Sequence, residues 1–187
     1  GDHIHQVIRV GPKTELLVAD PTGVFGEKQI ADLVTPLVKD PSRAKGREFE
    51  GAAVLVQLGI AQQQLAQWDA ALAAFGAAKT LTPDDPEVDA YLVQANLTAR
   101  RFDRAEALAR EALVREPDQP RMVRLRAQAL AKGGKVAEAN KLLEDGILKQ
   151  PQNREFVVGL ADLYAEQKRT DEAIRLLEQR SEERRVG

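Results

Sequence analysis

One arrangement of residues recurs every 34 positions over most of the chain after residue 51. In its first copy, Leu58-Gly59 is followed by Trp68-Asp69, two alanines, Phe75 and a proline. Later copies keep the alanine and, up to residue 151, the proline. The fixed positions are Ala71, Ala105, Ala139 and Ala173, and Pro83, Pro117 and Pro151. A period of this length with small residues and prolines in phase indicates a solenoid of stacked helix pairs.

The repeat divides the chain into four units of two helices each, and the expected units are 52–85, 86–119, 120–153 and 154–180. Their expected helices are 52–65 and 69–81, 86–99 and 103–115, 120–132 and 136–149, and 154–167 and 171–180. The recurring alanines should lie where the two helices of a pair cross, because a larger side chain would push the helix axes apart. Residues 181–187 lose the pattern and are expected to form an irregular tail.

The first 26 residues do not share the repeat. Two extended runs, Ile4–Val10 and Glu15–Ala19, flank the turn-forming segment Gly11–Thr14, and this predicts a short β-hairpin.

Residues 27–51 are expected to form a leading helix and a linker. Apolar residues at helical spacing predict a helix over Glu27–Lys39. A second helix, with Ser42 as a candidate N-cap, could continue into the first repeat, although Gly46 and Gly51 weaken it.

Composition agrees with a helical array and excludes several functions. The 187 residues are 43% hydrophobic and only 4% aromatic, and the net charge is −2, which gives no reason to expect nucleic acid as a partner. The lack of cysteine excludes disulfides and thiolate chemistry. No apolar run approaches the roughly 20 residues of a membrane span, so we expect no membrane insertion. The compartment stays open between the cytoplasm and, if an upstream signal was removed, the periplasm or extracellular space.

Signatures of catalysis and of cofactor or metal binding are few. The chain has no glycine-rich phosphate loop, no G-x-S-x-G and no H-E-x-x-H, so we expect no enzyme and no cofactor. His3 and His5 could hold a metal with Asp2, but we interpret them as part of a chain terminus without a metal. The glycosylation triplet that begins at Asn96 falls on a helix face that is expected to pack.

The recurring residues resemble the tetratricopeptide repeat over residues 52–180. The sequence departs from the family pattern in places: of the aromatic residues expected in the first helices only Tyr164 is kept, and Gly59 is not repeated. The resemblance implies an all-α right-handed solenoid, whose first helices line a concave groove that binds a protein or peptide partner. Chaperone-binding members grip a terminal carboxylate with Lys and Asn, but the matching positions here are Val56, Gln57, Ile60 and Tyr91. We therefore expect no binding of chaperone tails.

By phase with the family, thirteen positions are expected to line the groove. They are Val56, Ile60 and Gln63, then Glu87, Ala90 and Gln94, then Arg121, Arg124, Gln128 and Lys132, and finally Glu155, Val158 and Asp162. The third set is spaced 3, 4 and 4 residues apart and so forms one stripe along a helix. This stripe is either a cationic patch for an acidic peptide or a solvated face balanced by Glu155 and Asp162.

The sequence therefore predicts a non-catalytic scaffold that holds a partner segment in the groove. The alternative is self-assembly into a homo-oligomer, because Ile174, Leu176 and Leu177 lie on the last helix and no polar capping helix follows it. Head-to-tail contacts of that kind close into rings or extend as filaments. A further alternative is an accessory domain of a longer enzyme or cytochrome, whose upstream part is missing.

Overall fold

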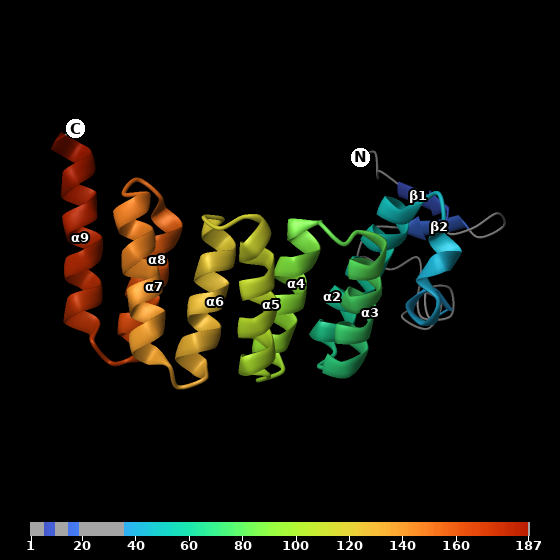
Figure 1. Ribbon diagram of the computed structural model, residues 1–187, viewed down its shortest axis with the longest axis horizontal. Helices are drawn as coiled ribbons and strands as arrows, with labels where there is room; N and C mark the ends of the chain where they lie inside the picture. Colours follow the sequence, from blue (N-terminus) through green and yellow to red (C-terminus); the bar gives the residue numbers. More distant parts are fainter. Residues whose placement is uncertain (1–5, 10–14, 19–35, 187) are drawn as a thin grey trace, which may run out of the picture. The chain divides into compact units, whose positions relative to one another are not determined.

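The computed structural model describes residues 6–9, 15–18 and 36–186, and helices predominate in this part of the chain (Figure 1). The chain forms two compact units, Gly1–Ala95 (unit 1) and Asn96–Gly187 (unit 2), and the boundary between them falls inside a helix. Within the described residues the helices form successive hairpins, so the predicted all-helical class is confirmed.

Unit 1 begins with two short strands. β1 (Gln6–Arg9) and β2 (Glu15–Val18) pair antiparallel, with Gln6 opposite Val18, and β1 lies next to the first long helix. The predicted pairing of two extended runs is confirmed for these residues, whereas the predicted turn over 11–14 lies outside the described residues.

Residues 36–39 of unit 1 are helical, and further helices follow them. They are the 3-10 helix η1 (Pro41–Ala44), α2 (Glu48–Gln64), α3 (Trp68–Leu81) and α4 (Pro86–Thr98), which continues into unit 2. Of the predicted leading helix, residues 27–35 lie outside the described residues. The prediction of a continuous helix from Ser42 into the first repeat is wrong, because Gly46 has a φ of +80° and separates η1 from α2.

Unit 2 contains five further helices with bounds close to those predicted. They are α5 (Phe102–Arg115), α6 (Pro120–Lys132), α7 (Val136–Lys149), α8 (Arg154–Glu166) and α9 (Thr170–Val186). Each helix packs against the next in sequence, and α6 also packs against α8. The first helices of the third and fourth repeats therefore lie side by side.

The expectation of an irregular tail from residue 181 is not met, since α9 runs through Val186. Prolines follow α3, α5 and α7 within two residues of their ends, at Pro83, Pro117 and Pro151, but the matching position of the fourth repeat is Arg185. Residues 181–186 contain neither glycine nor proline, and Glu and Arg favour helices, so nothing local ends α9 earlier.

The four recurring alanines are all buried, as predicted. Ala71, Ala105 and Ala139 have no exposed surface, and Ala173 is 7% exposed. Burial of so small a side chain indicates that neighbouring backbones come close at each of these points, because little side-chain volume separates them.

A left-handed residue ends the first helix of every repeat. Ala66, Arg100, Gly134 and Lys168, spaced 34 residues apart, have φ values of +57°, +60°, +88° and +61°. The residue after each of them donates its N–H over 2.8 Å to a carbonyl five positions earlier. These four pairs are Gln67 with Gln62, Arg101 with Asn96, Lys135 with Leu130, and Arg169 with Tyr164. This is the Schellman arrangement, which glycine usually terminates, yet three of the four positions here carry a side chain.

We predict opposite stability changes at two of these positions. Lys168→Gly should raise the free energy of unfolding by about 1 kcal/mol, because a Cβ disfavours positive φ, and Gly134→Ala should lower it by about as much. A Cβ at Gly134 would meet nothing within 4 Å, so the effect there is one of the backbone alone. Urea unfolding measures both changes, and shifts in the same direction would contradict this explanation.

A buried ion pair lies between α3 and α4 in unit 1. Lys79 Nζ is 2.5 Å from Asp89 Oδ1, with side chains 23% and 7% exposed, and Lys79 also donates to the Pro83 carbonyl. The same two positions in the following repeats are apolar and buried. They are Leu113 with Val123, and Ile147 with Val157. Lys79 and Asp89 thus place charged groups at positions that are apolar in the next two repeats.

We predict that Lys79→Leu alone lowers the free energy of unfolding by about 3 kcal/mol, because it removes the ammonium group that pairs with the buried Asp89 carboxylate. The double variant Lys79→Leu/Asp89→Val should return to within about 1 kcal/mol of the original chain, since it restores the apolar pattern of the later repeats. Urea unfolding of both variants and of Asp89→Val completes the cycle. A double variant as unstable as the single one would refute this explanation.

Candidate functional site

The candidate site is the surface that α6 and α8 present side by side in unit 2, here called the inner face. Its half-buried or exposed side chains are Arg121, Arg124, Gln128 and Lys132 of α6, and Glu155, Val158, Asp162 and Glu166 of α8. The α6 residues share one side of the helix because they are three or four positions apart. Seven of these eight residues are among those that the sequence predicted, and Glu166 is the exception.

Two ion pairs link the helices across the inner face. Arg124 Nε lies 2.7 Å from Glu155 Oε2, and Lys132 Nζ lies 3.2 Å from Glu166 Oε1. The α6 stripe is therefore neutralised in part by α8, which agrees with the interpretation that Glu155 balances it. Pairs with this much exposure contribute at most about 1 kcal/mol each, so a partner's charged groups can exchange with them.

Gly159 brings Arg124 close to α8. A Cβ at this glycine would lie 3.0 Å from Arg124 Cγ and 3.2 Å from its Cδ, so any side chain would displace the aliphatic part of the arginine. The side chain of Arg124 is 27% exposed, with its guanidinium held on Glu155. Its position is thus set by packing as well as by charge.

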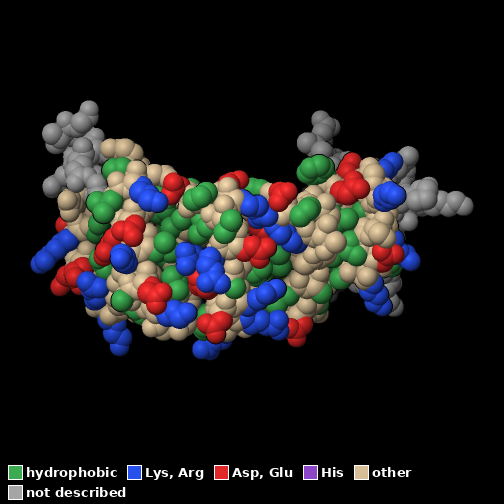
Figure 2. Space-filling model, in the orientation of Figure 1, with side chains coloured by type: hydrophobic (Ala, Val, Ile, Leu, Met, Phe, Trp, Pro, Cys, Tyr) green, Lys and Arg blue, Asp and Glu red, His purple; other side chains and the backbone are tan. Residues whose placement is uncertain are grey.

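The middle of the inner face is apolar and its charges sum to zero. Val158 is 40% exposed and lies between Glu155 and Asp162 on the same side of α8. Three cations (Arg121, Arg124, Lys132) face three carboxylates (Glu155, Asp162, Glu166). On the side of the molecule that Figure 2 shows, acidic and basic side chains are likewise interspersed rather than gathered by sign. Such a face recognises an arrangement of groups rather than bulk charge.

The predicted groove residues of unit 1 are less accessible. Ala90 is fully buried and Val56 is 9% exposed, so neither offers much surface to a ligand. Ile60 and Gln63 are half-buried on α2. On α4, Glu87 and Gln94 are exposed, as expected for groove residues.

Tyr91, one of the positions compared with the chaperone clamp, packs within unit 1. Its ring stacks on Phe75 with centroids 5.5 Å apart and planes 9° apart. Phe75 in turn lies against Gly59, where a Cβ would come within 2.5 Å of the ring. These contacts explain why the first repeat keeps its glycine, and they make Tyr91 part of the packing.

A cluster around Tyr164 connects three helices of unit 2. The phenol donates to Glu144 Oε1 of α7 over 3.4 Å, and the Arg169 guanidinium lies 4.2 Å from the centroid of the ring. Burial raises the pKa of Tyr164, and the charge of Glu144 raises it further. Hydrogen bonds from Arg169 lower the pKa of Glu172. The cluster fixes the turn between α8 and α9, and it leaves the phenol protonated at neutral pH.

Three contacts made by side chains of α6 were missed by reasoning from the sequence. Lys132 meets Glu166, and Arg124 rests on Gly159, as described above. The third is an ion pair of Arg126 with Glu106 at 3.0 Å, with side chains 27% and 15% exposed. The contact of Lys132 with Glu166 could have been predicted from the sequence, because the two residues have opposite charges and are one repeat of 34 residues apart. The third contact also had a signal, because Arg126 stands where the other repeats have Leu58, Leu92 and Leu160.

The remaining candidate sites add nothing to the inner face. Asn96 is 4% exposed within α4, so the acceptor asparagine of the glycosylation triplet is buried as expected. Asp2, His3 and His5 lie outside the described residues. Among the residues that are described, no group of three acidic or histidine side chains could hold a metal ion. None of the helices in that part of the chain has the length and apolar character of a bilayer span.

Comparisons with known proteins agree with this architecture. The family model of the tetratricopeptide repeat matches residues 60–129 and 130–186. None of the curated proteins compared with the chain matches it.

Several solved structures share the fold. MamA (41-end) from Desulfovibrio magneticus RS-1 has a TM-score of 0.56 at 15% identity, with 86% of this chain and 96% of that chain covered. The Arabidopsis OM64 TPR domain has a TM-score of 0.52 at 21% identity, covering 62% and 96%. The first TPR of Spaghetti (RPAP3), bound to the HSP90 peptide SRMEEVD, has a TM-score of 0.52 at 20% identity, covering 63% and 93%. At these identities the likeness is one of fold.

Proposed function

Because this chain belongs to the tetratricopeptide repeat family, we propose that it is a non-catalytic scaffold that binds an extended segment or a helix of a partner protein. The inner face of unit 2 is the surface we assign to this role. The observation that carries the proposal is the exposed Val158, which lies on the same face as two exposed ion pairs. A partner's charged groups can replace one member of each pair. An apolar contact surrounded by adaptable charges is what a partner segment needs for anchoring and register.

The partner we propose carries charges of both signs. An acidic segment would compete with Glu155 for Arg124, and a basic one would meet Asp162. Asp162 is exposed and forms no ion pair with any other side chain that the structure describes. A helix with an apolar stripe between acidic and basic residues satisfies both.

A solved neighbour supports peptide binding in general but not the same peptide. The RPAP3 domain is bound to an HSP90 peptide that ends in EEVD. In this chain, Val56 is buried and Tyr91 stacks on Phe75, so the positions compared with the chaperone clamp offer no cation for a terminal carboxylate. The expectation that chaperone tails do not bind remains a prediction.

The test places a photo-cross-linking amino acid at position 158 and, as a matched probe, at the exposed Val114 of α5. We predict that a partner is captured from position 158 and not from position 114. Arg121→Glu/Arg124→Glu should reduce this capture at least tenfold, because it sets like charges against Glu155 and removes two donors.

Arg110→Glu/Lys141→Glu, which makes the same charge change at exposed positions of α5 and α7, serves as the control and should leave capture unchanged. Equal capture from both probe positions, or equal loss in both double variants, would dismiss the inner face as the binding surface.

Self-assembly is a second candidate, and the exposure of α9 favours it. Ile174 and Leu177 are 47% and 45% exposed one turn apart on this helix. Such a pair can pack against a helix of another copy, in a head-to-tail contact.

We predict that, if copies assemble through α9, sedimentation shows a mass that rises with concentration and that Ile174→Glu/Leu177→Glu abolishes the rise. Burial of a carboxylate in an apolar contact is unfavourable by several kcal/mol, which is enough to dissociate a weak interface. A single mass at all concentrations for the original chain would eliminate this candidate.

A further inference from the structure

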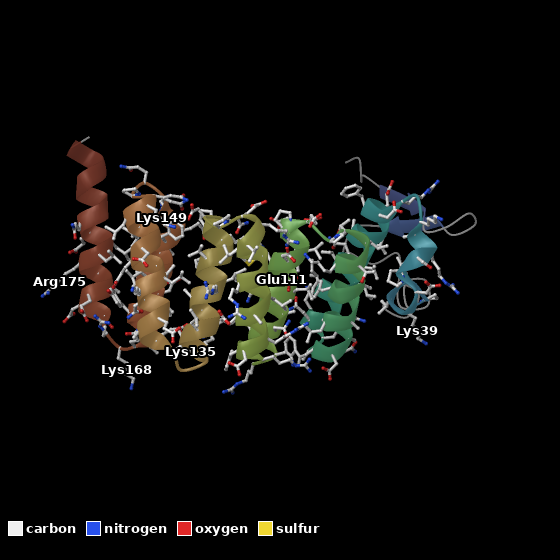
Figure 3. The ribbon with its side chains drawn as sticks, in the orientation of Figure 1. Lys39, Glu111, Lys135, Lys149, Lys168 and Arg175 are labelled. Carbon is white, nitrogen blue, oxygen red and sulfur yellow. The ribbon has the colours of Figure 1, made fainter. Side chains whose placement is uncertain are left out.

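A pocket of about 350 Å³ lies in unit 2 near the C-terminal end of α7. Its floor consists of Val123 from α6, Leu142 from α7 and Phe156 from α8. Lys149, another lining residue, lies at one end of the helices of unit 2 in Figure 3, and Lys135 lies at the other. None of the eight residues of the inner face lines the pocket, so it is a separate surface.

The floor of the pocket is fixed by a glycine and an aromatic ring. Gly146 stands where the two preceding repeats have Ala78 and Ala112, and a Cβ here would lie 2.7 Å from Phe156 Cδ1. The ring of Phe156 is 1% exposed and Val123 is 5% exposed. Both are therefore held by the core, and the pocket is formed before any ligand arrives.

The side of the pocket is held by polar contacts between a loop and the end of α7. Lys149 Nζ lies 3.0 Å from Asp118 Oδ1, and Gln150 Nε2 donates to the Asp118 carbonyl over 3.1 Å. These contacts fix the loop between α5 and α6, which contributes Pro117 to the lining. A preformed pocket loses little entropy on binding.

The rim combines an apolar contact with a carboxylate. Leu148 lines the pocket and is 78% exposed, so it extends the apolar surface outward. The charge of Lys149 is neutralised by Asp118. Asp145 is exposed on the same rim and forms no ion pair with the side chains that the structure describes, so the rim carries a negative charge available to a partner.

We propose that this pocket is a second binding site, which takes one large apolar side chain of a protein segment that carries Lys or Arg within one helical turn of it. A volume of about 350 Å³ is at the small end of ligand pockets and accommodates an aromatic side chain. Asp145 selects the neighbouring cation. The site does not depend on the inner face, and a partner can occupy either one alone.

The test titrates three alanine-based helical peptides into the full chain labelled at its methyl groups. One peptide carries Trp and Arg four residues apart, one has Glu in place of the Arg, and one has Ala in place of the Trp. The first should shift the methyl signals of Leu142 and Leu148 at about 1 mM or below. Glu for Arg should weaken binding about threefold, and Ala for Trp at least tenfold.

Variants at exposed positions keep the fold intact. Asp145→Lys should reverse the preference between the Arg and Glu peptides, and Leu148→Glu should weaken the first peptide about tenfold. Val114→Glu is the matched control, because Val114 is also 78% exposed at the same position of the preceding repeat but does not line the pocket. The proposal is overturned by the absence of shifts, by shifts at Val158 only, or by equal affinity for the Arg and Glu peptides.

Discussion

The close approach of helices at buried alanines is the contact on which the rest of the structure depends. With Ala105 and Ala139 fully buried, the hairpins of unit 2 nest closely enough for α6 to reach α8. Side chains one repeat apart then become neighbours, as Lys132 and Glu166 do. The ion pairs of the inner face therefore depend on the close packing of the helices, because the charged groups could not meet if a larger residue separated these helices.

Much of this architecture could be predicted because its signals are periodic. Alanines and prolines in phase fixed the existence of each helix and the bounds of α6 and α7. The left-handed turns could not be predicted at Ala66, Arg100 and Lys168, since these residue types carry no preference for positive φ; only Gly134 signals it. The end of α9 does not follow from the repeat, because the helix continues to Val186 after the repeat pattern is lost.

The candidate site was predicted in part for a related reason. Phase placed Arg124 and Glu155 on facing helices, but it could not say that Gly159 brings the arginine stem down onto α8. The burial of Ala90 could not be predicted either. The repeat phase indicates on which side of the helix a side chain lies, but not how much of it the neighbouring residues cover. The pocket beside α7 depends on Gly146 and Phe156 together, ten residues apart. The change from alanine to Gly146 is visible in the sequence, but its contact with the ring of Phe156 is not.

The ion pair of Lys79 with Asp89 bears on how an array of nearly identical hairpins finds its proper order. If α4 were exchanged for α6 beside α3, the Lys79 ammonium would face Val123, an aliphatic group, and Asp89 would be left elsewhere without its counter-charge. Stranding both ions in this way is unfavourable by several kcal/mol, whereas the apolar boundaries of the later hairpins would tolerate exchange. The pair of Lys79 with Asp89 thus favours the correct neighbour for α3, and this fixes where the later hairpins follow in the array.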